Sequence, residues 1–178
     1  MPAEERGECQ IRDVSLRKKS RDLAVDFHVA GAFDREVEDT IQSGLPRTLS
    51  FLLELYRPRP LLPDRRLRAW RLEHTIRYDN LKDEFLITRT VTAGGAGRPL
   101  PPIVLRGLPK AVQTAANVEG FALPLAESGS PVRYLLRIRA RVEPLEEGDA
   151  PWFGHLPVPF GPSFGQRKSD WYVQEFEF

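Results

Sequence analysis

Cysteine is nearly absent from this sequence, and long apolar runs are missing. Cys9 is the single cysteine among 178 residues, which excludes an intramolecular disulfide and a zinc site built from several cysteines. No apolar run approaches the roughly 18 residues of a membrane-spanning helix, and residues 1–10 lack the apolar core of a secretion signal. We therefore expect no transmembrane segment and no leader at the start of this chain.

A strong net charge is missing as well. The chain has 26 basic and 25 acidic residues, so no global field attracts nucleic acid or an anionic membrane, and such a partner would need a local patch. The composition, 41% apolar and 29% charged, is typical of a soluble globular protein. We expect one domain over residues 1–178, with residues 1–9 flexible, and we favour a monomer.

The sequence carries no recognisable catalytic or cofactor motif. It has no Gly-x-Ser-x-Gly elbow, no Walker loop and no dinucleotide fingerprint, and the glycine-rich stretch at 94–97 is not followed by Lys-Ser/Thr or by a helix. The three histidines are too scattered for a metal motif; His74 is expected in the core, and His155 lies in an irregular segment. We predict no enzyme, no metal and no cofactor.

Asp26 and His28 are the one pair whose spacing suits a metal. They share a strand face at i, i+2, and a third group from elsewhere could complete a site. Paired structural roles are the simpler interpretation.

The clearest local signal is a helix that changes directly into a strand between Phe33 and Tyr56. Asp34 is a suitable N-cap, apolar residues recur at fourfold spacing to Leu45, Gly44 suits a left-handed C-cap, and Pro46 ends the helix. From Arg47 onward apolar and polar residues alternate, which predicts a half-buried strand.

Strand signals dominate the rest of the chain. Alternation predicts an opening hairpin over 14–29, a second hairpin over 70–91, and strands over 134–142 and 171–178. A second helix is expected at about 109–119, whereas the proline-rich stretch 57–64 and the stretch 92–102 should be loops, and 143–167 has no periodicity. These signals predict an α+β fold: a twisted antiparallel sheet of about seven strands with two helices packed on one face.

The same periodicities predict the core. Its members should be the apolar residues on the inward faces of these elements: Val25, Phe27, Ile41, Phe51, Leu53, Trp70, Leu72, Ile76, Leu136, Ile138, Phe176 and Phe178.

Three short motifs resemble a bacterial family known as domain of unknown function 4390. They are Ser43-Gly44-Leu45-Pro46, the run from Ile76 to Leu81, and Ser169-Asp170-Trp171-Tyr172, placed in the family's order after a hairpin and an acidic helix. The resemblance implies an exported, periplasmic or otherwise extracytoplasmic protein, with a cytoplasmic location as the alternative because no leader precedes these motifs. It implies no activity.

Two groups of arginines are candidates for anion binding. Arg133, Arg137, Arg139 and Arg141 lie on one face of a strand, and we expect the Arg139/Arg141 face to pair with Glu175 and Glu177 on a neighbouring strand. The second group has few acids nearby and lies in and after the proline loop: Arg57, Arg59, Arg65, Arg66, Arg68 and Arg71.

A proline-rich segment with four aromatics is the leading candidate for a binding surface. Proline holds a backbone extended and lowers the entropy cost of binding, and exposed aromatics can anchor a protein or a lipid-like surface; the residues are Trp152, Phe153, Phe160 and Phe164. The alternative is that these aromatics cover the core. We thus expect a non-catalytic extracytoplasmic binding or accessory domain acting through this loop, with an anion- or nucleic-acid-binding module using the arginines as the alternative.

Overall fold

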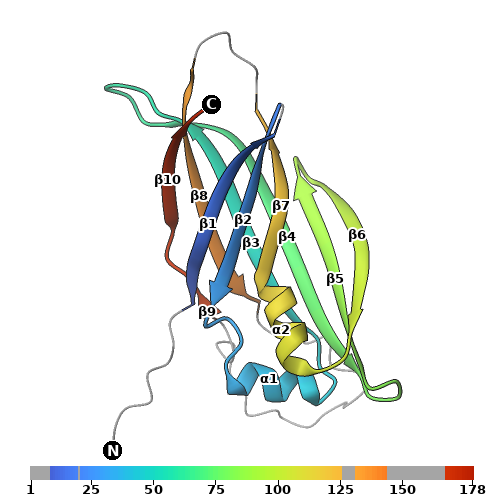
Figure 1. The fold of residues 1–178 in the computed structure, drawn as a ribbon. Coiled ribbons are helices and arrows are strands. Elements are labelled where there is room, and N and C mark those ends of the chain that lie inside the picture. Colours follow the sequence, from blue (N-terminus) through green and yellow to red (C-terminus); the bar gives the residue numbers. More distant parts are fainter. Residues whose placement is uncertain (1–8, 20, 126–130, 144–166) are drawn as a thin grey trace, which may run out of the picture.

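The computed structural model describes residues 9–19, 21–125, 131–143 and 167–178. Of residues 1–9, which the sequence predicts to be flexible, only Cys9 lies within these ranges. Within the described residues the chain forms a three-stranded sheet, a seven-stranded sheet and two helices (Figure 1). The elements are β1 (Gln10–Lys19), β2 (Asp22–Ala30), α1 (Arg35–Gln42), β3 (Arg47–Arg57), β4 (Arg65–Asp79), β5 (Glu84–Ala93), β6 (Ala96–Leu105), α2 (Leu108–Ala116), β7 (Asn117–Pro124), β8 (Arg133–Val142), β9 (Arg167–Lys168) and β10 (Tyr172–Glu177).

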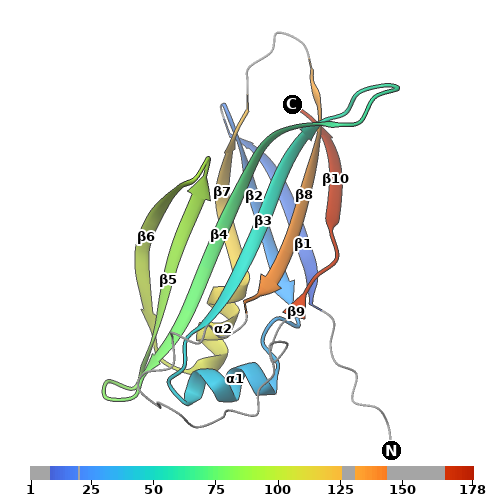
Figure 2. The same cartoon turned by 180° about the vertical axis from the view of Figure 1, so that it is seen from behind.

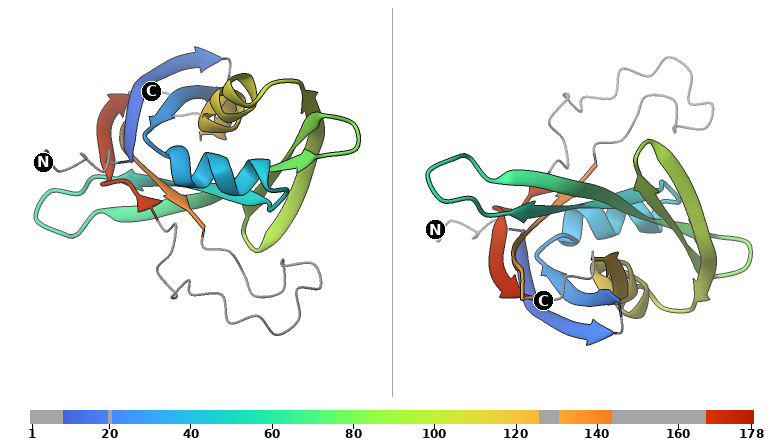
Figure 3. Two further views of the ribbon diagram at one scale, coloured as in Figure 1. Left: turned by 90° about the horizontal axis from the view of Figure 1, so that it is seen from below. Right: turned by 90° about the horizontal axis from the view of Figure 1, so that it is seen from above.

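The two sheets face each other. The larger one has the order β10-β8-β3-β4-β5-β6, with β9 also paired to β8, and the smaller one has the order β1-β2-β7. The smaller sheet and both helices lie on the same face of the larger sheet, with α1 and α2 gathered at one end (Figures 1 and 3). The predicted α+β fold with an antiparallel sheet of about seven strands is confirmed, and the opening hairpin belongs to the second sheet.

The junction between α1 and β3 follows the sequence signals. The Asp34 carboxylate accepts a hydrogen bond from the Val37 N–H at 2.9 Å, which satisfies one of the free donors at the helix start. Gly44 has a φ of +90° just after the helix, a conformation that suits glycine. This cap directs the chain from α1 straight into the central strand β3.

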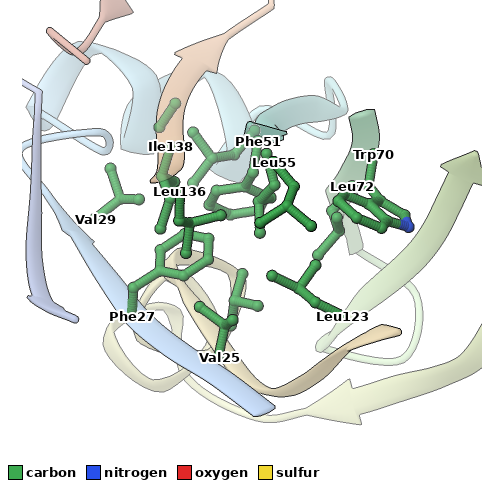
Figure 4. Packing of buried hydrophobic residues seen from close by; sticks show 14 of the residues in the cluster. Val25, Phe27, Val29, Phe51, Leu55, Trp70, Leu72, Leu123, Leu136 and Ile138 are labelled. Atoms are coloured by element: carbon green, nitrogen blue, oxygen red, sulfur yellow. The ribbon is translucent and has the colours of Figure 1, made fainter. Parts of the chain in front are cut away.

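The main core lies between the two sheets (Figure 4). Phe27 from β2 meets Phe51 from β3 edge to face, with ring centroids 5.5 Å apart. Every predicted core residue is buried except Phe176 and Phe178, which are half-buried and pack against the same cluster. Close packing of this kind fixes the strand registers and therefore the position of the loops between them.

One prediction for the region after β5 is wrong. Residues 92–102 are not a loop: Gly94 and Gly95, with φ of 60° and 86°, turn the chain into β6, which pairs with β5. The prolines of β6 are tolerated because it is the last strand of the sheet, where an N–H facing away from the neighbour is dispensable.

The second helix is shorter than expected. It ends at Ala116 rather than near residue 119, because Asn117–Pro124 pairs with β2 as β7. Val118 and Leu123 are buried by that pairing. Tertiary pairing therefore overrides the local helix pattern.

Candidate functional site

The leading candidate from the sequence falls where the structure gives no description. Trp152, Phe153, Phe160 and Phe164 lie outside the described residues, and so does His155. Their predicted contact surface stays a prediction. The arginines of the proline loop, in contrast, are all described.

These arginines gather on a projecting hairpin. β4 continues past its neighbour β5 and joins β3 through the proline loop, and residues 57–68, here called the hairpin tip, extend beyond the body of the molecule (Figures 1 and 2). The tip lies at the end of β3 opposite to α1 (Figure 2). Its charged residues are one aspartate and five arginines: Asp64, Arg57, Arg59, Arg65, Arg66 and Arg68.

Like charges face each other across this hairpin. Arg57 is the direct cross-strand partner of Arg65, an arrangement that disfavours the hairpin unless an anion compensates. Arg66 reaches Glu54 at 3.2 Å, but its side chain is 61% exposed and the pair is correspondingly weak. Within the described part of the chain, no acidic partner reaches Arg57, Arg65 or Arg68. The tip is therefore a local excess of positive charge in a nearly neutral protein.

The tip also exposes large apolar side chains. Leu61 is fully exposed, Leu62 is 59% exposed and Leu67 is 37% exposed. Leu61 has a φ of +65°, in the left-handed region that leucine rarely adopts. The sequence does contain a signal for this feature, the pair Leu61-Leu62 placed between two prolines. Only the arginines of this segment were predicted as candidates.

The arginines of β8 are arranged differently from the prediction. β10 does pair with β8, but Glu177 lies opposite Arg133 and Glu175 lies opposite Leu135. The predicted pairing of Arg139 and Arg141 with these glutamates is therefore wrong. In an antiparallel pair the end of β10 meets the start of β8, which is the half of the strand without Arg139 and Arg141.

Aromatic rings and local acids engage these arginines instead. Arg137 lies over the Tyr56 ring and Arg139 over the Trp171 ring, at 5.2 and 5.4 Å from the centroids. Arg141 pairs with Glu143 at 3.3 Å. This row has structural partners along most of its length, so it is a weaker candidate for an anion site than the tip.

Glu143 is the centre of a network on this outer face. Its carboxylate accepts hydrogen bonds from the Arg71 guanidinium at 3.0 Å and from the buried Ser50 hydroxyl. Arg71, which the sequence grouped with the tip arginines, also contacts Glu73 at 3.0 Å. Arg71 therefore belongs to the sheet face and not to the tip.

His74 is a core residue, as predicted. It is 5% exposed, and its Nδ1 lies 2.9 Å from the Ala115 carbonyl oxygen, which requires the ring proton to be on Nδ1. Burial lowers the pKa of His74 to about 4, and the nearby Arg89 acts in the same direction. A neutral, buried imidazole of this kind stabilises the fold.

Asp26 is also held by protein groups. The backbone N–H of Gly120 donates to its carboxylate at 2.6 Å, and Arg17 donates at 2.9 Å. Burial raises the pKa of Asp26, but these donors outweigh it and hold that pKa below its ordinary value. His28 contacts Asn117 at 2.6 Å. Among residues that the structure describes, no three His, Cys, Asp or Glu side chains are grouped as metal ligands.

Cys9 is buried against the core beside β9. Burial raises the pKa of its thiol to about 11, so the reactive thiolate is scarce at neutral pH. The nearest hollow, between the start of β1 and the β9–β10 segment, has a volume of about 360 Å³ and is lined by Cys9, Gln10, Ile11, Lys168, Asp170, Trp171 and Tyr172. Among these described residues, no hydrogen bond or ion pair joins the side chains of Cys9, Lys168, Asp170 and Tyr172 to one another.

Together these features define an α+β protein whose most distinctive described surface is a basic, apolar hairpin tip. Its sequence matches the family model Domain of unknown function (DUF4390) over residues 6–174. The chain therefore belongs to the DUF4390 family. The searches of curated proteins and of solved structures found no match. None of the helices that the structure describes has the length and apolarity to cross a membrane.

The three motifs that carried the resemblance have structural roles. Gly44 provides the left-handed residue after α1 and lies close to the Asn80 side chain in the β4–β5 turn. The Asp79 carboxylate accepts hydrogen bonds from the N–H groups of Leu81 and Lys82 in that turn. The Ser169 hydroxyl accepts a hydrogen bond from the Ala140 N–H at 2.9 Å. These motifs fix the scaffold and leave the tip as the candidate site.

Proposed function

We propose that this protein is a non-catalytic, extracytoplasmic binding or accessory domain that uses the hairpin tip to bind an anionic partner. The observation that carries the proposal is that Arg57 lies directly opposite Arg65 on a projecting hairpin. Among the described residues, neither arginine has an acidic partner. Such an arrangement costs stability in the free protein, and a bound anion compensates for it. Guanidinium groups suit phosphate, sulfate and carboxylate groups because their planar donors bind two oxygens at once.

Binding to heparin, a soluble polyanion, tests the proposal. The wild-type protein should bind heparin with an affinity that falls as salt rises, because each arginine contact releases counterions. The Arg57→Glu/Arg65→Glu variant should bind more weakly, with a slope of log affinity against log salt reduced by about two.

A matched variant controls for net charge. Arg77 and Lys82 are exposed at the other end of the larger sheet, near the β4–β5 turn. Arg77→Glu/Lys82→Glu changes the net charge by the same amount as the tip variant and should leave heparin binding almost unchanged. Equal losses in both variants would show that binding depends on net charge alone and would contradict the proposal.

The extracytoplasmic location is part of the proposal and rests on the family resemblance. Fractionating cells that produce the protein from its native gene tests it. Recovery in the periplasmic fraction supports the location, and recovery with cytoplasmic markers contradicts it. The role predicted for the aromatic segment at 152–164 is a separate hypothesis. Replacing Trp152 and Phe160 with serine should weaken partner capture and leave the melting temperature nearly unchanged, whereas a large loss of stability would contradict it.

A further inference from the structure

The hairpin tip combines two properties that serve different kinds of partner. Its arginines suit any anionic surface, whereas its leucines have no use against a purely polar polyanion. Leu61 and Leu62 occupy the apex of the hairpin, and arginines precede and follow them on both strands. At the far end of the molecule Leu81 is equally exposed on the β4–β5 turn, and Val104 on β6 is 55% exposed, but the acids Asp79, Asp83 and Glu84 accompany the basic residues there. An apolar apex with a basic collar is therefore specific to the tip.

The shape of this surface favours a soft, extended partner. The tip projects from the body of the molecule in each of the ribbon views (Figures 1, 2 and 3), and Leu61 and Leu62 on this projecting loop are exposed. A protein partner would need a complementary pocket and a broad contact area, which a single loop does not provide. A lipid bilayer accepts a convex apolar loop without a preformed pocket, and its headgroups offer phosphate to the arginines.

The loop backbone is set in advance. Pro58, Pro60 and Pro63 restrict φ, and the Arg59 guanidinium donates to the Pro63 carbonyl oxygen at 3.0 and 2.7 Å, which closes the loop on itself. Leu61 adopts φ +65° in this loop, and its side chain is directed fully into solvent. Strain at an exposed position is a sign of function, because nothing in the folding of the core requires it. A preset loop also loses little entropy when it binds.

We propose that the hairpin tip docks on an anionic lipid bilayer, with Leu61 and Leu62 entering the boundary between headgroups and acyl chains and the arginines binding lipid phosphates. This inference rests on the proposed function and names the partner of the same site. Long arginine side chains keep their charge at the headgroup level while their stems lie against apolar surface. Each basic residue near an anionic bilayer adds about fivefold in affinity, and the leucines add an apolar contribution that salt does not screen.

Cosedimentation with vesicles tests the inference. The wild-type protein should bind vesicles of phosphatidylcholine mixed with phosphatidylglycerol far better than vesicles of phosphatidylcholine alone. Leu61→Ser/Leu62→Ser should lose about tenfold or more in affinity for the mixed vesicles while it keeps its binding to heparin. Leu81→Ser removes an equally exposed leucine from the far end and should bind vesicles like the wild type.

Insertion has a direct readout. A Leu61→Cys variant can be labelled with an environment-sensitive fluorophore, because Cys9 is buried and reacts slowly. Its emission should increase and shift to the blue on mixed vesicles, whereas the same label at Leu81→Cys should not respond. Unfolding of a variant is checked by its heparin binding and its circular dichroism.

The possible failures are distinguishable. Heparin binding without vesicle binding overturns the lipid inference and leaves the anionic-partner proposal intact. Vesicle binding that is unchanged by Leu61→Ser/Leu62→Ser, with no response of the fluorophore, overturns insertion. If the wild-type protein binds neither heparin nor mixed vesicles, both proposals are overturned.

Discussion

The arginines of β8 and those of the hairpin tip differ in what faces them. On β8, Arg141 pairs with Glu143, and Arg137 and Arg139 lie over aromatic rings. At the tip, Arg57 faces Arg65. Both groups were comparable candidates in the sequence, so the neighbours supplied by the fold decide between them. Arginines that already contact acids or aromatic rings of the sheet are structural. Arginines that lie opposite another arginine are available to a partner.

The largest expected effect concerns a positive charge that the fold excludes altogether, the protonated form of the buried His74. The pKa of His74 lies near 4 in the folded protein, below its ordinary value of 6.5. The unfolded chain therefore takes up a proton that the folded protein refuses as the pH falls from 6.5 to 4, and stability is lost over that window. The loss should approach about 3 kcal/mol, since each unit of pKa difference corresponds to about 1.4 kcal/mol.

Urea unfolding at a series of pH values measures this effect. The wild-type protein should lose about 3 kcal/mol more than a His74→Gln variant between pH 7 and pH 4. A constant offset between the two proteins does not matter, because only the difference in pH dependence is compared. Parallel curves for the two proteins would show that His74 is not the group responsible.

Removing Glu143 tests the structural side of the comparison. Glu143→Ala removes the partner of Arg71 and Arg141 and the acceptor of the Ser50 hydroxyl. The two ion pairs are partly exposed, so the free energy of unfolding should fall by only about 1–2 kcal/mol.

The control for this experiment is Glu175→Ala. Glu175 is exposed and lies opposite Leu135 rather than an arginine, so its removal should change stability by less than about 0.5 kcal/mol. A larger effect for Glu175 than for Glu143 in chemical denaturation would reverse the assignment of the two faces.

The smallest expected effect is at the tip itself. Arg57→Glu places opposite charges across from each other and should stabilise the protein by a few tenths to about 1 kcal/mol, a rise in melting temperature of about 1–4 °C. Arg57→Glu/Arg65→Glu restores like charges and should return the melting temperature to that of the wild type. A single variant that melts below the wild type would show that the tip arginines already have favourable partners.

The sequence was most informative where one face of an element is buried. Phe51 and Leu53 on β3, and Trp70 and Leu72 on β4, are buried as their alternation requires. Register between distant strands was not predictable, because the spacing of residues along β8 and β10 does not say which residues meet. That is why the partners of Arg139 and Arg141 were wrong although the neighbouring strands were right.

The candidate site was predicted in part. The excess of arginine around Pro58 to Pro63 was visible in the sequence, and the structure places five of these residues on one projecting tip. The sixth, Arg71, was misassigned because it is adjacent in sequence but faces Glu73 and Glu143 on the sheet. The exposure of Leu61 and Leu62 was not predicted, because the sequence of an irregular loop does not indicate whether a leucine folds back on the core.

The prolines of β6 have a consequence for how copies of this protein meet. Among the described strands β6 pairs with β5 alone, so it forms one margin of the larger sheet. Pro99, Pro101 and Pro102 carry no hydrogen on their nitrogens, and the register of β6 with β5 shifts between Leu100 and Ile103. Missing donors and an irregular register make this margin a poor template for a strand from a second molecule. We therefore expect the residues that make β6 resemble a loop in the sequence to disfavour edge-to-edge aggregation of the concentrated protein.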